Sequence, residues 1–208
     1  IHSIIIMHEL AHQWFGNLIT PEDWTHIWLS EGVATYVEAL WMEHEEGAAG
    51  LKNFMSQRQW GLGYLQDPLL RRPDVDYPRY YFHVSVYHKG GWVMHMLRRL
   101  LGDEHFFAGL SAYVSDPDLR WKTANTDDLI SAFEEVSGRD LETFFHQWLE
   151  WSTYPIYDYS YQQEWQGGQN HVSVRLRQVQ DPDPTYGMQP YEVPVDFRFF
   201  NSTSDTTF

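Results

Sequence analysis

The stretch His8-Glu9-Leu10-Ala11-His12, near the start of a 208-residue chain, decides how the rest of the sequence is interpreted. Apolar residues around it recur at helical spacing, so the stretch is predicted to lie on a helix. Residues four positions apart on a helix project from one face, so both imidazoles can bind a single metal ion. Glu9 lies beside them, where a carboxylate can take a proton from a metal-bound water. The stretch therefore predicts a hydrolytic zinc site.

Two histidines do not complete a catalytic zinc site, which has three protein ligands and an open position for water or substrate. The candidate third ligand is Glu31, in Trp28-Leu29-Ser30-Glu31-Gly32, because it follows near the start of a second predicted helix. Residues Asn17 to Thr25 contain Pro21 and predict a reversal of the chain that brings the two helices together. Without the histidine motif, Glu31 would more simply be a first-turn acid favoured by the helix dipole.

Composition excludes several classes of site and partner. The chain has no cysteine, which excludes disulfides, thiolate ligands and cysteine nucleophiles and leaves histidine and carboxylate as the strong metal ligands. The 29 Asp and Glu against 14 Lys and Arg give a net charge of -15, which disfavours nucleic acid as a partner. No run of about 18 apolar residues predicts a membrane span. The 43% hydrophobic and 17% aromatic residues suffice for a sizeable core.

The apolar pattern predicts a fold that is mainly α followed by β. Helical spacing extends to about Trp151, after which aromatic and β-branched residues alternate. We expect a helical zinc-binding part over residues 1–153 and a β-rich region over 154–208, which either packs on the helices or opens a longer sandwich. The predicted helices are Ile4 to Phe15, Leu29 to His44, Leu51 to Trp60, Val86 to Leu101, Glu104 to Val114, Thr126 to Ser137 and Leu141 to Leu149. The predicted strands are Ile156 to Tyr161, His171 to Val179 and Val193 to Phe200.

The residues His8 to Asn17, HELAHQWFGN, followed by Trp28 to Gly32, resemble the aminopeptidase N type of zinc metallopeptidase. This is a gluzincin family, in which 18 residues separate the HExxH motif from a glutamate, as they do here. The resemblance covers about the first 155 residues. It implies one Zn²⁺ ion held by His8, His12 and Glu31, with peptides as substrates. It also implies the helical half of a thermolysin-like catalytic domain, followed by a sandwich-like β-rich region.

The resemblance extends to Val86-Tyr87-His88-Lys89-Gly90-Gly91, which is similar to the family's Val-Tyr-Glu-Lys-Gly stretch. It implies that Glu9 is the general base and that Tyr87 donates a hydrogen bond to the oxyanion that forms when water attacks a carbonyl. His88 departs from the family, which usually has glutamate there. Glu38 is predicted to orient a ligand histidine, and the alternative is a glutamate on an exposed helix face.

The predicted function is zinc-dependent hydrolysis of peptide bonds, with removal of N-terminal residues as the first hypothesis. The family recognises the free amine through a Gly-x-Met-Glu-Asn segment upstream of the metal motif, and that segment does not occur in this sequence. Two alternatives therefore stay open: an endopeptidase of the thermolysin type, and an inactive metal-binding or interaction fragment. Because a metal-binding helix begins the sequence, we expect the upstream catalytic half in a larger parent protein.

Overall fold

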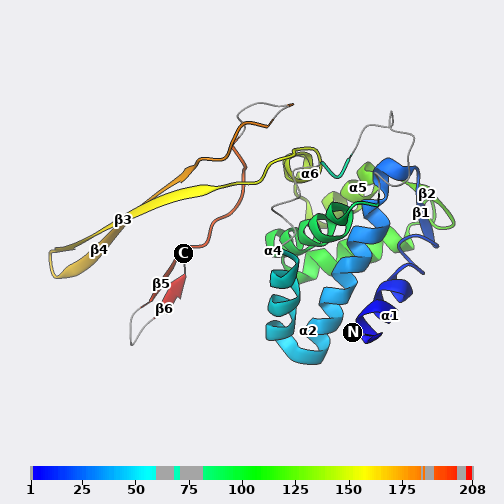
Figure 1. Ribbon diagram of the computed structural model, residues 1–208, viewed down its shortest axis with the longest axis horizontal. Coiled ribbons are helices and arrows are strands. Elements are labelled where there is room, and N and C mark those ends of the chain that lie inside the picture. Colours follow the sequence, from blue (N-terminus) through cyan, green and yellow to red (C-terminus); the bar gives the residue numbers. More distant parts are fainter. Residues whose placement is uncertain are drawn as a thin grey trace.

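The computed structural model describes residues 2–59, 68–70, 82–183, 185, 190–200 and 205–207. Apart from two three-residue strands among the helices, helices come first and strands follow, so the predicted order of a mainly α part and a β part is confirmed (Figure 1). The helices are α1 His2–Ala11, η1 Trp24–His26, α2 Trp28–Gln59, α4 Val84–Ser115, α5 Thr126–Ser137 and α6 Glu142–Leu149. The strands are β1 Ile19–Pro21, β2 Lys122–Ala124, β3 Tyr157–Gln166, β4 Gln169–Gln178, β5 Arg198–Phe200 and β6 Asp205–Thr207. None of the described helices has the length and apolar character of a membrane-spanning segment.

The two longest helices each change direction at a glycine. Gly47 in α2 has φ 67° and Gly102 in α4 has φ 77°, a backbone conformation that glycine adopts without steric cost. The sequence predicted a separate helix on either side of each glycine, and the final residue of one of these, Trp60, lies outside the described residues. In Figure 1 the second half of α2 runs back beside the first half. Positions twenty residues apart on α2 therefore come into contact.

Helices α2 and α4 approach each other most closely at a pair of glycines. A Cβ atom added at Gly32 would lie 2.8 Å from the Cα of Gly90, and one added at Gly90 would lie 2.7 Å from the Cα of Gly32. Real Cβ atoms essentially never come so near, so only hydrogen fits between the two backbones. Because Gly32 follows Glu31 and Gly90 lies one turn after Tyr87, this contact sets the distance between two predicted site residues.

A short parallel pair of strands ties the segment before α2 to the segment before α5. Ile19 pairs with Lys122, and Pro21 pairs with Ala124. Beside it, the indole Nε1 of Trp28, fully buried at the start of α2, donates a 3.0 Å hydrogen bond to Thr126 Oγ1. These contacts fix the entry to α2. The sequence predicted only a chain reversal here, because three-residue strands that pair across about a hundred positions carry no local pattern.

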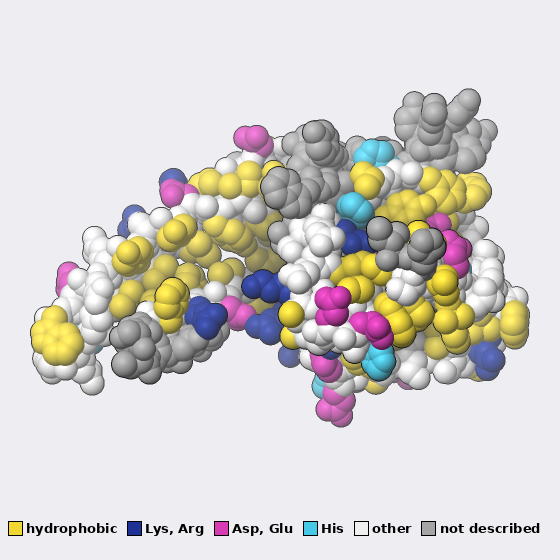
Figure 2. All heavy atoms as spheres, turned by 60° about the horizontal axis from the view of Figure 1, so that its bottom comes forward, with side chains coloured by type: hydrophobic (Ala, Val, Ile, Leu, Met, Phe, Trp, Pro, Cys, Tyr) yellow, Lys and Arg dark blue, Asp and Glu magenta, His cyan; other side chains and the backbone are white. Residues whose placement is uncertain are grey.

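Beyond the helices, β3 and β4 form a long antiparallel ribbon that projects from the helical part (Figure 1). Gly167 and Gly168 form its turn with φ 62° and 79°, as a two-residue hairpin of this hand requires. One face is apolar, with Tyr159, Tyr161 and Trp165 exposed by 70%, 68% and 75%, and Figure 2 shows hydrophobic side chains along the ribbon. The strands predicted over Ile156 to Tyr161 and His171 to Val179 thus form, but each described ribbon has only two strands.

The strand predicted over Val193 to Phe200 was wrong in extent. Only its last residues, Arg198–Phe200, form a strand, and they pair with β6. The residues just before Val193 return to α6. There the Tyr191 ring lies 4.9 Å from that of Trp148, and the side-chain amide of Gln147 exchanges two 2.9 Å hydrogen bonds with the backbone of Glu192. Part of the C-terminal region therefore packs on the helical part, which is one of the two arrangements expected. A domain boundary at residues 153–154 stays a prediction.

The glycine contact predicts the effect of a single methyl group. Gly90→Ala should lower the free energy of unfolding by about 1–3 kcal/mol, because the helices must separate or strain to accept the added carbon. Chemical denaturation of the chain, followed by circular dichroism, measures this. Ser111→Ala, an exposed position on the same helix, is the control and should change stability little. Equal stability of Gly90→Ala and the parent chain would contradict the close packing.

Candidate metal centre

The structure brings His8, His12 and Glu31 to one point, where α1 meets the start of α2. Glu31 Oε2 lies 3.2 Å from His8 Nε2 and 3.4 Å from His12 Nε2. One donor atom from each residue lies within 4.8 Å of the others, and no other three His, Asp or Glu residues in the described part of the chain do so. Two ligands about 2.1 Å from a tetrahedral ion lie about 3.4 Å apart. The donor set and its spacing therefore fit one zinc ion.

Both imidazoles are oriented with Nε2 toward this point. His12 Nδ1 lies 3.0 Å from the backbone carbonyl of Phe15, and because a carbonyl only accepts, this nitrogen carries the proton. His8 Nδ1 lies 2.7 Å from Oε1 of Glu38, which fixes the same tautomer. Nε2 of each ring thus faces Glu31. A hydrogen bond from the second ring nitrogen is the usual support of a metal-ligating histidine.

The electrostatics of the three residues also suit a cation. Burial lowers the pKa of His8, but hydrogen bonds to Glu31 and Glu38 outweigh it and raise that pKa to about 9. Burial raises the pKa of Glu31, but hydrogen bonds from His12 and His8 outweigh it and lower that pKa to about 2. The carboxylates therefore attract positive charge to this point. A divalent cation bound there would take the place of protons on the imidazoles.

The two predicted catalytic residues lie beside the three donors. Glu9 is exposed on α1. The ring of Tyr87, in the first turn of α4, stacks 6.2 Å from that of His8 at an interplanar angle of 26°. Burial raises the pKa of Tyr87, and the charges of Glu31 and Glu9 raise it further, so the phenol keeps its proton and can donate it in a hydrogen bond. The structure thus places Tyr87 beside His8 and within the field of the Glu9 charge.

Glu38 does not lie on an exposed helix face, because only 8% of it is accessible. Its Oε1 accepts from His8, and its Oε2 accepts a 2.8 Å hydrogen bond from Nη2 of Arg58. The sequence did not predict Arg58 as part of the site. No local signal identifies it, because it reaches Glu38 only through the reversal of α2 at Gly47.

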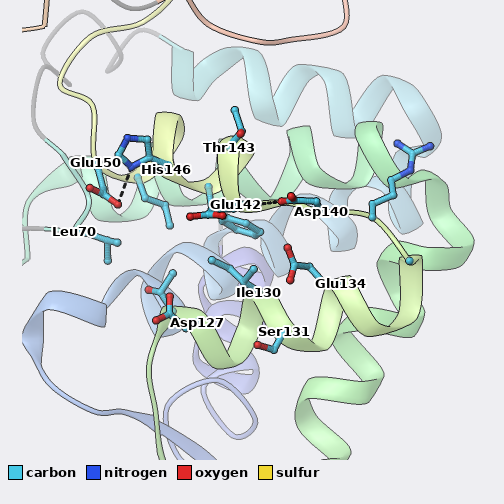
Figure 3. Close-up of a pocket in the computed structure, with 15 residues that line it drawn as sticks. Leu70, Asp127, Ile130, Ser131, Glu134, Asp140, Glu142, Thr143, His146 and Glu150 are labelled. Atoms are coloured by element: carbon cyan, nitrogen blue, oxygen red, sulfur yellow. Dashed lines mark hydrogen bonds and ion pairs between the residues drawn. The ribbon is translucent and has the colours of Figure 1, made fainter. Parts of the chain in front are cut away.

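A separate hollow of about 1080 Å³ lies between α5 and α6, and none of the three donors lines it. Figure 3 shows acidic side chains around it, among them Glu134 and Asp140. These two accept backbone hydrogen bonds of 2.7 Å from Leu141 and 3.0 Å from Glu142. They therefore stabilise the start of α6, which accounts for acids at this place without a bound cation.

Comparison with known proteins decides the family. Residues 2–148 match the family model described as the Peptidase family M1 domain. The chain belongs to peptidase family M1. The predicted resemblance is thereby confirmed, and so is the enzyme class of the family, zinc metallopeptidases and aminopeptidases.

The M1 relatives are much longer than this chain. It is 36% identical over 166 residues to Aminopeptidase M1-A of Oryza sativa subsp. japonica, covering 74% of this chain and 18% of the relative. It is 35% identical over 165 residues to Aminopeptidase N of Lactococcus lactis subsp. cremoris (strain MG1363), covering 74% and 19%. The chain thus spans about a fifth of the length of these curated relatives.

Solved structures agree with the M1 assignment. The crystal structure of an M1 zinc metallopeptidase from Deinococcus radiodurans has a TM-score of 0.61 and 30% identity, and the match covers 74% of this chain and 34% of that one. Legionella pneumophila aminopeptidase A, solved in complex with aspartic acid, has a TM-score of 0.68 at 20% identity, covering 85% of this chain and 19% of that one. The second likeness supports the fold alone.

The geometry predicts how zinc binding depends on Glu31. The chain should bind about one Zn²⁺ ion, and Glu31→Ala should weaken binding by at least about 100-fold, since loss of a ligand costs more than loss of its hydrogen-bonding support. Competition with a chromogenic chelator measures the affinity. Glu43→Gln, further along α2, is the control and should bind zinc as the parent chain does. Unchanged affinity in Glu31→Ala would remove Glu31 from the ligands.

Proposed function

We propose that this chain provides the zinc-binding and water-activating part of an aminopeptidase, which removes residues from the N-termini of peptides. The observation that carries the proposal is the convergence of His8, His12 and Glu31 on one point, with Glu9 and Tyr87 beside it, in a chain of family M1. Within this proposal, residues 1–153 contain the chemistry, and residues 154–208 form a β-rich region.

The proposed mechanism needs no covalent intermediate. His8, His12 and Glu31 would hold one Zn²⁺ ion, which when bound would lower the pKa of water and polarise a carbonyl. Glu9 accepts the proton of the attacking water and passes it to the leaving amine. Its exposed position on α1 leaves it accessible to both. Tyr87 donates a hydrogen bond to the carbonyl oxygen as negative charge grows there, and its raised pKa keeps the phenol protonated for this role.

The preference for N-termini rests on the family and not on a residue of this chain. The described residues include acids near the metal point, Glu9 and Glu38, but His8 and Arg58 already engage Glu38.

Glu9 provides the first test of the function. In the complete protein, Glu9→Gln should lower turnover of aminoacyl anilides by about 100-fold or more while zinc content stays at one ion, because proton transfer is lost and the ligands are kept. Hydrolysis rates and elemental analysis measure the two quantities. Cleavage of N-terminally blocked, internally quenched peptides at comparable rates would instead indicate an endopeptidase. A protein that binds zinc but cleaves neither substrate would indicate an inactive metal-binding module.

Tyr87 provides an independent test of how the oxyanion is stabilised. Tyr87→Phe removes only the phenolic donor, so turnover should fall by about two orders of magnitude with little change in KM and none in zinc content. Steady-state kinetics of the complete protein measure this. The matched control is Tyr159→Phe, on the exposed ribbon, which should leave turnover unchanged. Near-normal turnover in Tyr87→Phe would exclude Tyr87 from the mechanism.

A further inference from the structure

We propose that Arg58 is a positioning residue of the metal centre, which holds the Glu38 carboxylate in the orientation that fixes the ligand His8. The inference rests on the proposed zinc site and extends it to a residue of the second half of α2. It gives a function to a half-buried arginine that neither the motif nor the mechanism uses.

The two oxygens of Glu38 have different partners. Oε1 lies 2.7 Å from Nδ1 of His8, and Oε2 lies 2.8 Å from Nη2 of Arg58. Rotation of the carboxylate would break both hydrogen bonds together. Glu38 is 8% exposed and the Arg58 side chain 19% exposed, so little water is available to replace either partner. A charge-assisted pair in such surroundings is strong and costly to leave incomplete.

Arg58 is itself held in place, as a positioning group must be. Its guanidinium carbon lies 3.3 Å from the centroid of the Phe54 ring, and Nη1 donates a 3.4 Å hydrogen bond to the Phe54 carbonyl. Phe54 is 4% exposed and belongs to the hydrophobic core. A planar guanidinium stacked on a buried ring loses little freedom when it binds a carboxylate. The orientation of Glu38 is therefore determined before a metal ion arrives.

The contacts connect three helical segments. His8 lies on α1, Glu38 on the first half of α2, and Arg58 on the second half, beyond the reversal at Gly47. The hydrogen-bonded series thus anchors the metal-binding helix to both halves of α2. A hydrogen bond to the ring nitrogen that does not face the metal fixes the ligand imidazole, and such support preorganises metal sites.

His88 does not compete with Glu38 for the guanidinium of Arg58. Burial lowers the pKa of His88, and the nearby charge of Arg58 lowers it further while Glu38 opposes this, so His88 is neutral and lies within the field of both groups. Among the described residues, its buried Nδ1 has no hydrogen-bond partner, and neither has Nε of Arg58. A glutamate in place of His88, as in the related Val-Tyr-Glu-Lys-Gly stretch, would compete for the guanidinium. In this chain Glu38 has no such competitor at position 88.

The test measures the affinity of the 208-residue chain for Zn²⁺ alone, by chelator competition. Arg58→Met should weaken zinc binding about tenfold, the lower end of the effect of losing hydrogen-bonding support to a ligand. Arg58→Lys keeps the charge but not the planar fork, so its loss should be smaller. The control is Arg98→Met, which removes the 2.6 Å pair of Arg98 with Glu43 between α4 and α2, and which should bind zinc as the parent chain does.

A double-mutant cycle separates positioning from general stability. If Arg58 acts through Glu38, Arg58→Met should have no further effect on zinc affinity in a Glu38→Gln background. An equal loss in both backgrounds, an equal loss in Arg98→Met, or unchanged affinity in Arg58→Met would each overturn the inference. Circular dichroism reports whether each variant folds; if Arg58→Met does not, Arg58→Lys takes its place in the cycle. A parent chain that binds no zinc would overturn the proposed function itself, which distinguishes the two failures.

Discussion

The metal centre depends on a single carboxylate oxygen that reaches two imidazoles of another helix. Oε2 of Glu31 lies 3.2 Å from His8 and 3.4 Å from His12, in surroundings that admit little water. Burial of such polar groups costs free energy unless each finds a partner. The partners here are the three residues themselves, and their convergence leaves a point of negative potential with nitrogen and oxygen donors around it. Those are the ligand atoms that zinc prefers when no thiolate is available.

The position of Glu31 depends in turn on how α2 is held. Gly32 allows the backbones of α2 and α4 to touch at Gly90, which brings the helix that carries Tyr87 close to the helix that carries Glu31. At the same end of α2, Trp28 is fully buried and bonded to Thr126. Close packing around a backbone contact leaves little room for adjustment. The distances within the site are therefore set by packing contacts between residues that take no part in the reaction.

Hydrogen bonds from Nδ1 of the two histidines distinguish the metal centre from the other acidic clusters among the described residues. Phe15 and Glu38 accept from Nδ1 of the two histidines, which leaves the opposite nitrogens directed at one point. Around the hollow between α5 and α6, Glu134 and Asp140 accept from backbone amides and contribute to the fold. Acidic residues thus form a metal centre only where their oxygens converge with other donors. Among the described residues this convergence occurs once.

The sequence by itself determined what depends on local periodicity. Four-residue spacing put both histidines on one helix face, the spacing to Glu31 indicated the third donor, and the change of pattern near Trp151 separated helices from strands. The tertiary structure alone decided the contacts between distant segments. The β1–β2 pair joins Ile19 to Lys122, and the reversal of α2 joins Glu38 to Arg58. No periodicity encodes such contacts, because they follow from how the whole chain packs.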